Sequence, residues 1–200
     1  MKGLKLLIPP IYLVKVLKLL IPPIFTRLFS LAYKKFINKS QTKNISIEKN
    51  GEWYDKNTKS EFYVPYWDTH YYPAWSIIVD RLNKEKVNSI LDVGCGSGQM
   101  YRLIKNYLHL VKYNGFDFSK KRIDIANEFN PEGKFFVENA YTTNLFNDCD
   151  YDVIICTEVL EHLEKDCDLM DRIPKGKKFF GTVPDYDSSS HVRYFEKNES

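Results

Sequence analysis

Three glycines alternate with other residues in segment 91–98, which reads L-D-V-G-C-G-S-G. Glycine has no Cβ and adopts a positive φ at little cost, so such a loop lets a ligand lie close to the backbone. The next residue is Gln99, so the spacing is G-x-G-x-G and not the G-x-G-x-x-G of dinucleotide sites. Ordinary tight turns look similar, and the residues around the loop must therefore decide what it binds.

A carboxylate, Asp117, ends the next apolar and aromatic stretch, Lys112–Asp117. At the end of a strand beside the glycine loop, a carboxylate can accept hydrogen bonds from both hydroxyls of a ribose. Ser119 follows at the position that caps a helix predicted over 120–129. The loop and the acid together predict a site for a ligand that contains a nucleoside.

Acids and imidazoles gather in segment 157–163, T-E-V-L-E-H-L, and one more histidine follows downstream. The predicted cluster is Glu158, Glu161, His162 and His191. Its oxygens suit a hard divalent cation, and its imidazoles shift the preference toward a metal such as Mn²⁺. Without a metal, His162 or His191 would be the catalytic residue, accepting a proton as general base near pH 7. The structural alternative is that Glu161 and His162 only order the start of a helix.

The elements that position these residues alternate between strand and helix. Apolar runs predict strands over 90–93, 112–117, 134–138, 151–156 and 177–183. Helices are expected over 74–82, 99–110 and 120–129. This order predicts an α/β fold, a Rossmann-like doubly wound and mostly parallel sheet of five strands, whose carboxyl ends carry the ligand site.

The glycine loop and Asp117 resemble the S-adenosylmethionine site of class I methyltransferases. Segment 157–163 and H-V-R-Y-F at 191–195 resemble small-molecule methyltransferases similar to the ubiquinone-pathway O-methyltransferases, and the resemblance covers about 75–196. A more general resemblance extends to methyltransferases of bacterial surface-glycan clusters. It implies S-adenosylmethionine as cofactor, bound by Asp92, Gly94, Cys95, Gly96, Gly98, Asp117, Phe118, Asn139, Ala140 and Thr157. Asn139 stands where many relatives carry an acid, and its side-chain oxygen can still accept from the adenine amino group.

The acceptor predicted from this resemblance is a hydroxyl on a small molecule, a glycan precursor or a lipid-linked intermediate. The E-x-x-E-H spacing with a distant histidine also resembles the metal site of small-RNA terminal 2′-O-methyltransferases, which implies Mg²⁺ or Mn²⁺. RNA 2′-O-methylation is therefore an alternative, although the body has no concentrated basic stripe for nucleic acid. A third alternative is a truncated domain that binds the donor without turnover. A complete fold would need one more helix and two strands, about 45 residues, so the strand at 177–183 is expected to be an exposed edge unless another chain covers it.

Charge divides the chain into a basic N-terminal part and a mildly acidic body. Residues 1–39 contain eight Lys or Arg and no acid, whereas the rest has 21 basic and 26 acidic side chains. The segment K-L-L-I-P-P-I occurs twice, and its Pro-Pro pairs interrupt any helix long enough to span a bilayer. We expect a basic amphipathic arm over 1–37 that contacts an anionic membrane surface; the alternative is an arm that packs on the domain or a second subunit.

The remaining expectations concern domains and location. Residues 38–60 are polar and are expected to be a linker, and 61–200 to form the methyltransferase domain, with an aromatic N-terminal helical cover over 61–75. These aromatic side chains either stack on an acceptor or anchor the cover to the sheet. The four cysteines form no C-x-x-C pair, which favours a reducing cytoplasm, and Cys95 is expected to fill a tight turn. The oligomeric state stays open.

Overall fold

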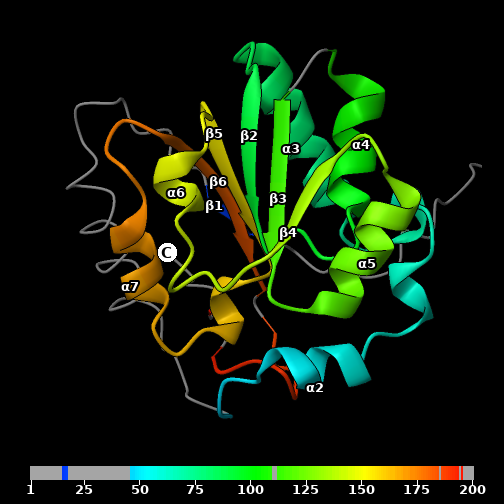
Figure 1. Ribbon diagram of the computed structural model, residues 1–200, viewed down its shortest axis with the longest axis vertical. Coiled ribbons are helices and arrows are strands. Elements are labelled where there is room, and N and C mark those ends of the chain that lie inside the picture. Colours follow the sequence, from blue (N-terminus) through cyan, green and yellow to red (C-terminus); the bar gives the residue numbers. More distant parts are fainter. Residues whose placement is uncertain (1–14, 18–45, 110–111, 185, 194, 196–200) are drawn as a thin grey trace, which may run out of the picture.

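The computed structural model describes residues 15–17, 46–109, 112–184, 186–193 and 195. Its centre is a six-stranded sheet with the order β1-β6-β5-β2-β3-β4 (Figure 1). The strands are β1 Lys15–Leu17, β2 Ser89–Val93, β3 Lys112–Asp117, β4 Lys134–Val137, β5 Val153–Thr157 and β6 Lys178–Val183. Strands β2 to β6 pair in parallel and β1 is antiparallel to β6. The five parallel strands confirm the predicted Rossmann-like α/β sheet.

Helices cover both faces of the sheet because its central strands are apolar on both faces. They are α2 Gly51–Lys56, α3 Tyr72–Lys84, α4 Gln99–Tyr107, α5 Lys120–Phe129, α6 Leu145–Asp148 and α7 Asp166–Arg172. Neighbouring residues of β2 point into different cores: Ile90 packs in a cluster with residues of α3 and α4, and Leu91 in a cluster with residues of α6 and α7. Figure 1 shows α6 and α7 on one side of the sheet and α4 and α5 on the other.

The edge strand β6 differs from the sequence prediction. Residues Lys15–Leu17 pair with its C-terminal half, with Lys15 opposite Val183, so the prediction of an exposed edge is wrong there. Pairing of β1 satisfies backbone groups that an open edge would leave to water. The rest of the predicted arm over 1–37 lies outside the described residues. The ends of β4, β5 and β6 differ from the predicted ends by one or two residues.

The segment predicted as a linker, 38–60, contains helix α2 in its described part. The side chain of Asn50 caps this helix by accepting a hydrogen bond from the backbone N–H of Trp53. One face of the helix is anchored by Tyr54, which is buried with its ring centre 5.0 Å from that of Phe118. The linker prediction failed because one buried aromatic residue and a cap fix this helix within an otherwise polar sequence.

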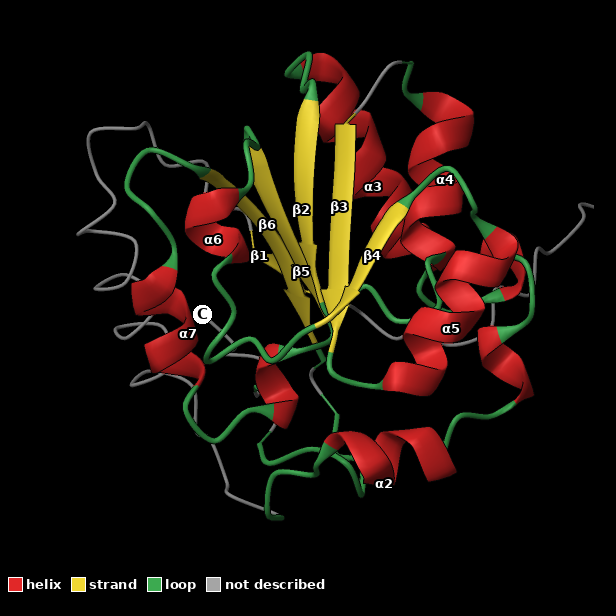
Figure 2. Ribbon diagram, viewed as in Figure 1, coloured by secondary structure: helices red, strands yellow, loops and turns green. Residues whose placement is uncertain are grey.

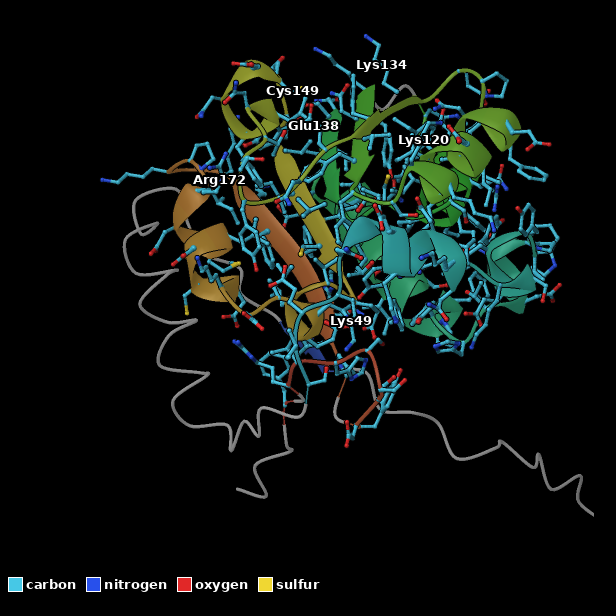
Figure 3. All side chains as sticks on the ribbon, turned by 60° about the horizontal axis from the view of Figure 1, so that its bottom comes forward. Lys49, Lys120, Lys134, Glu138, Cys149 and Arg172 are labelled. Atoms are coloured by element: carbon cyan, nitrogen blue, oxygen red, sulfur yellow. The ribbon has the colours of Figure 1, made fainter. Side chains whose placement is uncertain are left out.

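Helix α2 lies across the end of the sheet to which the parallel strands point (Figure 2). Figure 3 looks toward this end, where α2 crosses in front of the strands. In a parallel sheet the carboxyl ends of the strands are the usual place of a ligand site, so α2 covers the predicted site. Among the described residues, no helix has the length and apolar character needed to cross a bilayer.

Candidate functional site

The glycine loop follows β2 and leads into α4. Gly94, Gly96 and Gly98 have φ values of +72°, +54° and +73°, which side chains other than glycine rarely adopt. A Cβ on Gly94 would lie 2.3 Å from Cγ2 of Val159, whereas a Cβ on Gly96 would meet nothing within 4 Å. Gly96 therefore faces open space in which a ligand can lie directly on the backbone.

Asp117, at the end of β3, is joined to this loop. Its Oδ2 accepts a hydrogen bond from the backbone N–H of Gly96 at 3.1 Å, and its Oδ1 accepts one from Ser119 at 2.8 Å. Burial raises the pKa of Asp117, while the nearby Arg122 guanidinium and these two N–H groups lower it. The carboxylate thus has a fixed orientation beside the open face of Gly96.

Asp92, on β2 just before the loop, is buried in the core. The buried Tyr113 hydroxyl donates a short hydrogen bond to Asp92, and burial raises the pKa of Asp92 to about 7. Burial also raises the pKa of the Cys95 thiol. The Cys95 side chain packs closely against Gly115, because a Cβ added to Gly115 would lie 2.8 Å from the Cβ of Cys95. Cys95 therefore fills a tight turn as a neutral thiol.

Two adjoining cavities lie at this end of the sheet. The first lies beside the end of β3 and the segment 138–141. Its lining includes Gly94, Asp117, Phe118, Asn139 and Ala140. The second cavity is lined by Asp92, Gly94, Cys95, Gly96 and Thr157 among others. Of the predicted donor residues only Gly98 borders neither cavity, and a Cβ there would instead lie 2.7 Å from Nδ2 of Asn130.

Asn139 has a local structural role besides its place at the first cavity. Its side chain is exposed, and its Oδ1 accepts a hydrogen bond from the backbone N–H of Tyr141 at 2.8 Å. Its backbone carbonyl accepts from Thr142 and Thr143. The amide oxygen that was expected to receive the adenine amino group is thus already engaged in ordering the turn, although an amide oxygen can accept a second hydrogen bond.

The predicted acid and histidine cluster comes together only in part. Glu161, His162 and His191 each offer a ligand atom, and these atoms lie within 4.8 Å of one another. Glu158 is not in that group: its Oε1 accepts a hydrogen bond from the Thr182 hydroxyl at 2.8 Å. Its φ of +56° is in the left-handed region, which is strained for a residue other than glycine and is typical of functional sites. Burial raises its pKa to about 6.

Glu161 is fully buried, and neither of its carboxylate oxygens has a hydrogen-bond partner among the described residues. Its Oε1 lies 3.6 Å from Nε2 of His162. Burial raises the pKa of Glu161 well above its usual value, and the neighbouring Glu158 raises it further. A buried carboxyl group without partners is costly unless it is protonated or holds a cation.

The two histidines are held through the same ring atom. The Nδ1 of His162 lies 2.9 Å from the Ser190 carbonyl oxygen, and the Nδ1 of His191 lies 3.3 Å from the Tyr186 carbonyl oxygen. Because carbonyl oxygens only accept, each Nδ1 carries the proton and each Nε2 keeps a free lone pair. Burial lowers the pKa of His162 to about 4. Both imidazoles are therefore neutral at pH 7 and able to accept a proton or ligate a metal.

Sequence reasoning missed two residues that border both cavities, Tyr54 and Arg122. Tyr54 lies in the segment taken for a linker, and the signal that could have revealed its helix is the cap residue Asn50, three residues before Trp53. Arg122 lies in the first turn of α5. No local pattern distinguishes it from a solvent-exposed arginine.

The doubly wound parallel sheet, the glycine loop after β2 and the acid at the end of β3 define the class I type of methyltransferase fold. The chain belongs to a family of methyltransferase domains: the family model described as "Methyltransferase domain" matches residues 67–200.

Curated relatives agree with this family. The chain is 38% identical over 103 residues to a ubiquinone biosynthesis O-methyltransferase of Rickettsia bellii, covering 47% of this chain and 41% of that protein. It is 31% identical over 134 residues to the enzyme of the same name from Rickettsia typhi, covering 64% and 52%. The matches thus span about half the length of these relatives.

A solved structure shows the same fold. The plantazolicin methyltransferase BpumL, in complex with a pentazolic desmethylPZN analog and SAH, superimposes with a TM-score of 0.52 at 18% identity. The match covers 80% of this chain and 59% of that chain.

Proposed function

We propose that this chain binds S-adenosylmethionine and transfers its methyl group to a hydroxyl of a small molecule. The observation that carries the proposal is the pairing of Asp117 with Gly96: a carboxylate fixed beside a loop residue whose open face admits a ligand. The names of the curated relatives, O-methyltransferases, support oxygen as the acceptor atom.

The residues at the two cavities suit the donor. Asp117 would accept the ribose hydroxyls, while Phe118, Asn139 and Ala140 border the part of the first cavity where the adenine would lie. Gly94 borders both cavities, so a ligand resting on the loop can extend from one into the other. Bound S-adenosylmethionine supplies an electrophilic methyl group on a sulfonium.

The acceptor would occupy the second cavity. One wall of this cavity is aromatic and includes Phe62, Tyr71 and Trp75, and the rings of Tyr71 and Trp75 stack with centres 5.4 Å apart. Trp75 also packs in the core, which supports the anchoring role of the aromatic segment, and stacking on an acceptor would be its second role. Aromatic rings in this lining would align an acceptor and exclude water, which favours an in-line displacement. Within this class, a glycan precursor or lipid-linked hydroxyl is the finer proposal.

His162 is the proposed proton acceptor, with His191 as the second candidate. Both border the second cavity, and the Nε2 of a neutral imidazole can take the hydroxyl proton as the new C–O bond forms and the S–C bond breaks. The low pKa of His162, about 4, keeps it available as a base at neutral pH. It also makes it a weak base, so alignment must supply most of the rate enhancement.

A divalent cation at this site is a second proposal, and the partnerless carboxylate of Glu161 favours it. Glu161, His162 and His191 would hold Mg²⁺ or Mn²⁺, with Glu158 close by on the same cavity. The free Nε2 lone pairs, each with Nδ1 donating to a carbonyl oxygen, are the arrangement that metal-ligating histidines show. Such an ion would lower the pKa of an acceptor hydroxyl.

Calorimetric titration with S-adenosylmethionine tests the donor site directly. Wild-type protein is expected to bind, and Asp117→Ala to bind at least about 10-fold more weakly, because hydrogen bonds to charged groups contribute about 1.5–3 kcal/mol. Exposed Asp124→Ala is the matched control. No binding by folded wild-type protein would contradict the proposal.

Methyl-release assays separate the alternatives. A panel of phenols, sugars and short RNAs with free 2′-hydroxyls distinguishes a small-molecule from an RNA acceptor. Binding without turnover on any of them would favour a domain that only binds the donor. Full activity in EDTA would contradict the metal proposal.

We further propose a cytoplasmic location, with the predicted arm over 1–37, apart from the β1 residues Lys15–Leu17, contacting a membrane surface. The four cysteines, all described and all free, fit a reducing compartment. The basic, acid-free composition of the N-terminal segment supports attraction to anionic lipids.

A further inference from the structure

Arg122 is held between two aromatic rings at the junction of the two cavities. Its guanidinium carbon lies 4.8 Å from the ring centre of Tyr54 and 4.1 Å from that of Phe62. Both distances are within the range of cation–π interactions. Because Tyr54 belongs to α2 and Phe62 to the 3-10 turn Ser60–Phe62, the covering segment fixes the orientation of a side chain that comes from α5.

The guanidinium of Arg122 has hydrogen-bonding capacity that the described protein does not use. Its Nε is buried without a hydrogen-bond partner, and among the described residues its side chain forms no salt bridge. Asp117, whose pKa the charge of Arg122 lowers, already accepts hydrogen bonds at both oxygens from backbone N–H groups. A guanidinium presents five N–H donors, so this one is available to a ligand.

The charges of the residues that line the two cavities indicate which kind of ligand group Arg122 could bind. Their walls are acidic, with Glu48, Asp117, Glu138, Glu158, Glu61, Asp92 and Glu161 among the lining residues. Lys49 borders only the first cavity and Lys59 only the second. Arg122 is the one Lys or Arg among the described residues that borders both. A negatively charged group on a ligand that extends across the junction would therefore form its ion pair with Arg122.

We propose that Arg122 anchors the carboxylate at the amino-acid end of the methyl donor. The inference rests on the proposed function, in which Asp117 and the segment 138–140 take the nucleoside end and leave the amino-acid end near the glycine loop. That carboxylate is the donor's only anionic group. The planar guanidinium matches it with two parallel hydrogen bonds, and the rings of Tyr54 and Phe62 keep the guanidinium plane in place.

The test compares two ligands that differ in the amino-acid end. S-adenosylhomocysteine carries the carboxylate, and 5′-methylthioadenosine has the same nucleoside and sulfur without it. Calorimetric titration of wild type and Arg122→Gln with both ligands is expected to show a loss of about 10- to 100-fold for S-adenosylhomocysteine, the range for hydrogen bonds to charged groups. The affinity for methylthioadenosine is expected to change less than about threefold. Lys121→Gln, an exposed neighbour, is the matched control for removal of one positive charge.

Three results would overturn the inference. Equal losses for both ligands would mean that Arg122 only supports the fold of the pocket. Unchanged donor binding with a raised KM for the acceptor would place an acceptor anion there. Failure of folded wild type to bind either ligand would refute the proposed function itself, which sets that result apart from the other two. If Arg122→Gln does not fold, Arg122→Lys serves as the second variant, because it keeps the positive charge but lacks the two parallel N–H donors of the guanidinium. It is expected to weaken the binding of S-adenosylhomocysteine and not that of methylthioadenosine.

Discussion

Replacement of Glu161 by Gln is expected to stabilise the metal-free protein and to abolish its response to divalent cations. The wild-type carboxyl is fully buried and has no hydrogen-bond partner among the described residues. A glutamine amide keeps the shape and can donate to Nε2 of His162, which lies 3.6 Å from Oε1. The substitution thus removes an acid that is costly to ionise and offers its neighbour a hydrogen bond.

The size of this effect follows from the cost of leaving a buried polar group unpaired, about 1–3 kcal/mol and more for a charged group. For a chain of this length, 1 kcal/mol corresponds to about 2–4 °C in Tm. Glu161→Gln in EDTA should therefore melt about 2–12 °C above wild type at pH 8. A metal at 100 times its Kd would stabilise wild type by about 2.7 kcal/mol, and the variant should lose this shift.

The pH dependence gives a second readout. Because the pKa of Glu161 is raised in the folded state, the folded protein binds more protons than the unfolded chain above about pH 4.5, and its stability falls as pH rises toward the folded pKa. The pKa of His162 is lowered to about 4, so its titration makes the folded state more stable as pH rises. This effect is complete above about pH 7, where the histidine is neutral in both the folded and the unfolded state. As pH rises above the range in which His162 titrates, the wild-type stability should fall relative to that of Glu161→Gln until the folded-state Glu161 is ionised.

Thermal unfolding from pH 7 to 9, with EDTA and with added Mg²⁺ or Mn²⁺, measures all of these effects. The exposed Glu128→Gln serves as a control for the loss of one negative charge. A variant that is less stable than wild type in EDTA, or that retains the metal-induced shift, would refute the reasoning. Glu161 would then be a carboxyl with an unseen structural partner rather than a cation ligand.

Further predictions concern the loop, a buried ion pair and the N-terminal segment. Gly96→Ala should weaken S-adenosylhomocysteine binding and cost about 1–2 kcal/mol of stability, since the positive φ is its only source of strain. Gly94→Ala should cost more stability, because its Cβ would lie 2.3 Å from a methyl group of Val159. Denaturant melts measure the loss of stability, and titrations measure the loss of binding. Arg193→Ala should cost about 3–5 kcal/mol, the range for breaking a buried ion pair, because it removes the guanidinium nitrogen that lies 2.5 Å from Asp166; equal stability in urea melts would contradict this. Replacement by Gln of the Lys and Arg residues of 1–37 that lie outside β1 keeps the β1–β6 pairing and should abolish flotation with anionic liposomes; unchanged flotation would contradict the membrane role of this segment.

Much of the fold was predictable because its signals are local. The apolar runs that became β2 and β3 and the cap of α5 depend on residues adjacent in the chain. Ser119 was predicted to cap α5, and its side chain accepts a hydrogen bond from the N–H of Arg122. The position of Asp117 beside the glycine loop follows from topology, since the carboxyl ends of adjacent parallel strands meet at one edge.

Other features depend on contacts between residues far apart in the chain. The pairing of Lys15–Leu17 with β6 joins segments more than 160 residues apart, and no sequence pattern indicates such a partner. Tyr54 and Arg122 belong to the site because α2 folds back over α5. The sequence also grouped Glu158 with the other cluster residues, but its left-handed backbone and its hydrogen bond to Thr182 set it apart.

The sequence by itself therefore determined the class of fold and the glycine and acid pair of the proposed donor site, because period, turn and cap signals act over a few residues. Only the tertiary structure decided which side chains are left without partners. Glu161 is costly because burial removes water and no described neighbour replaces it, and the guanidinium of Arg122 is held in place by two rings from elsewhere in the chain. Burial and pairing are properties of the packed chain, and the chemistry of this site depends on them.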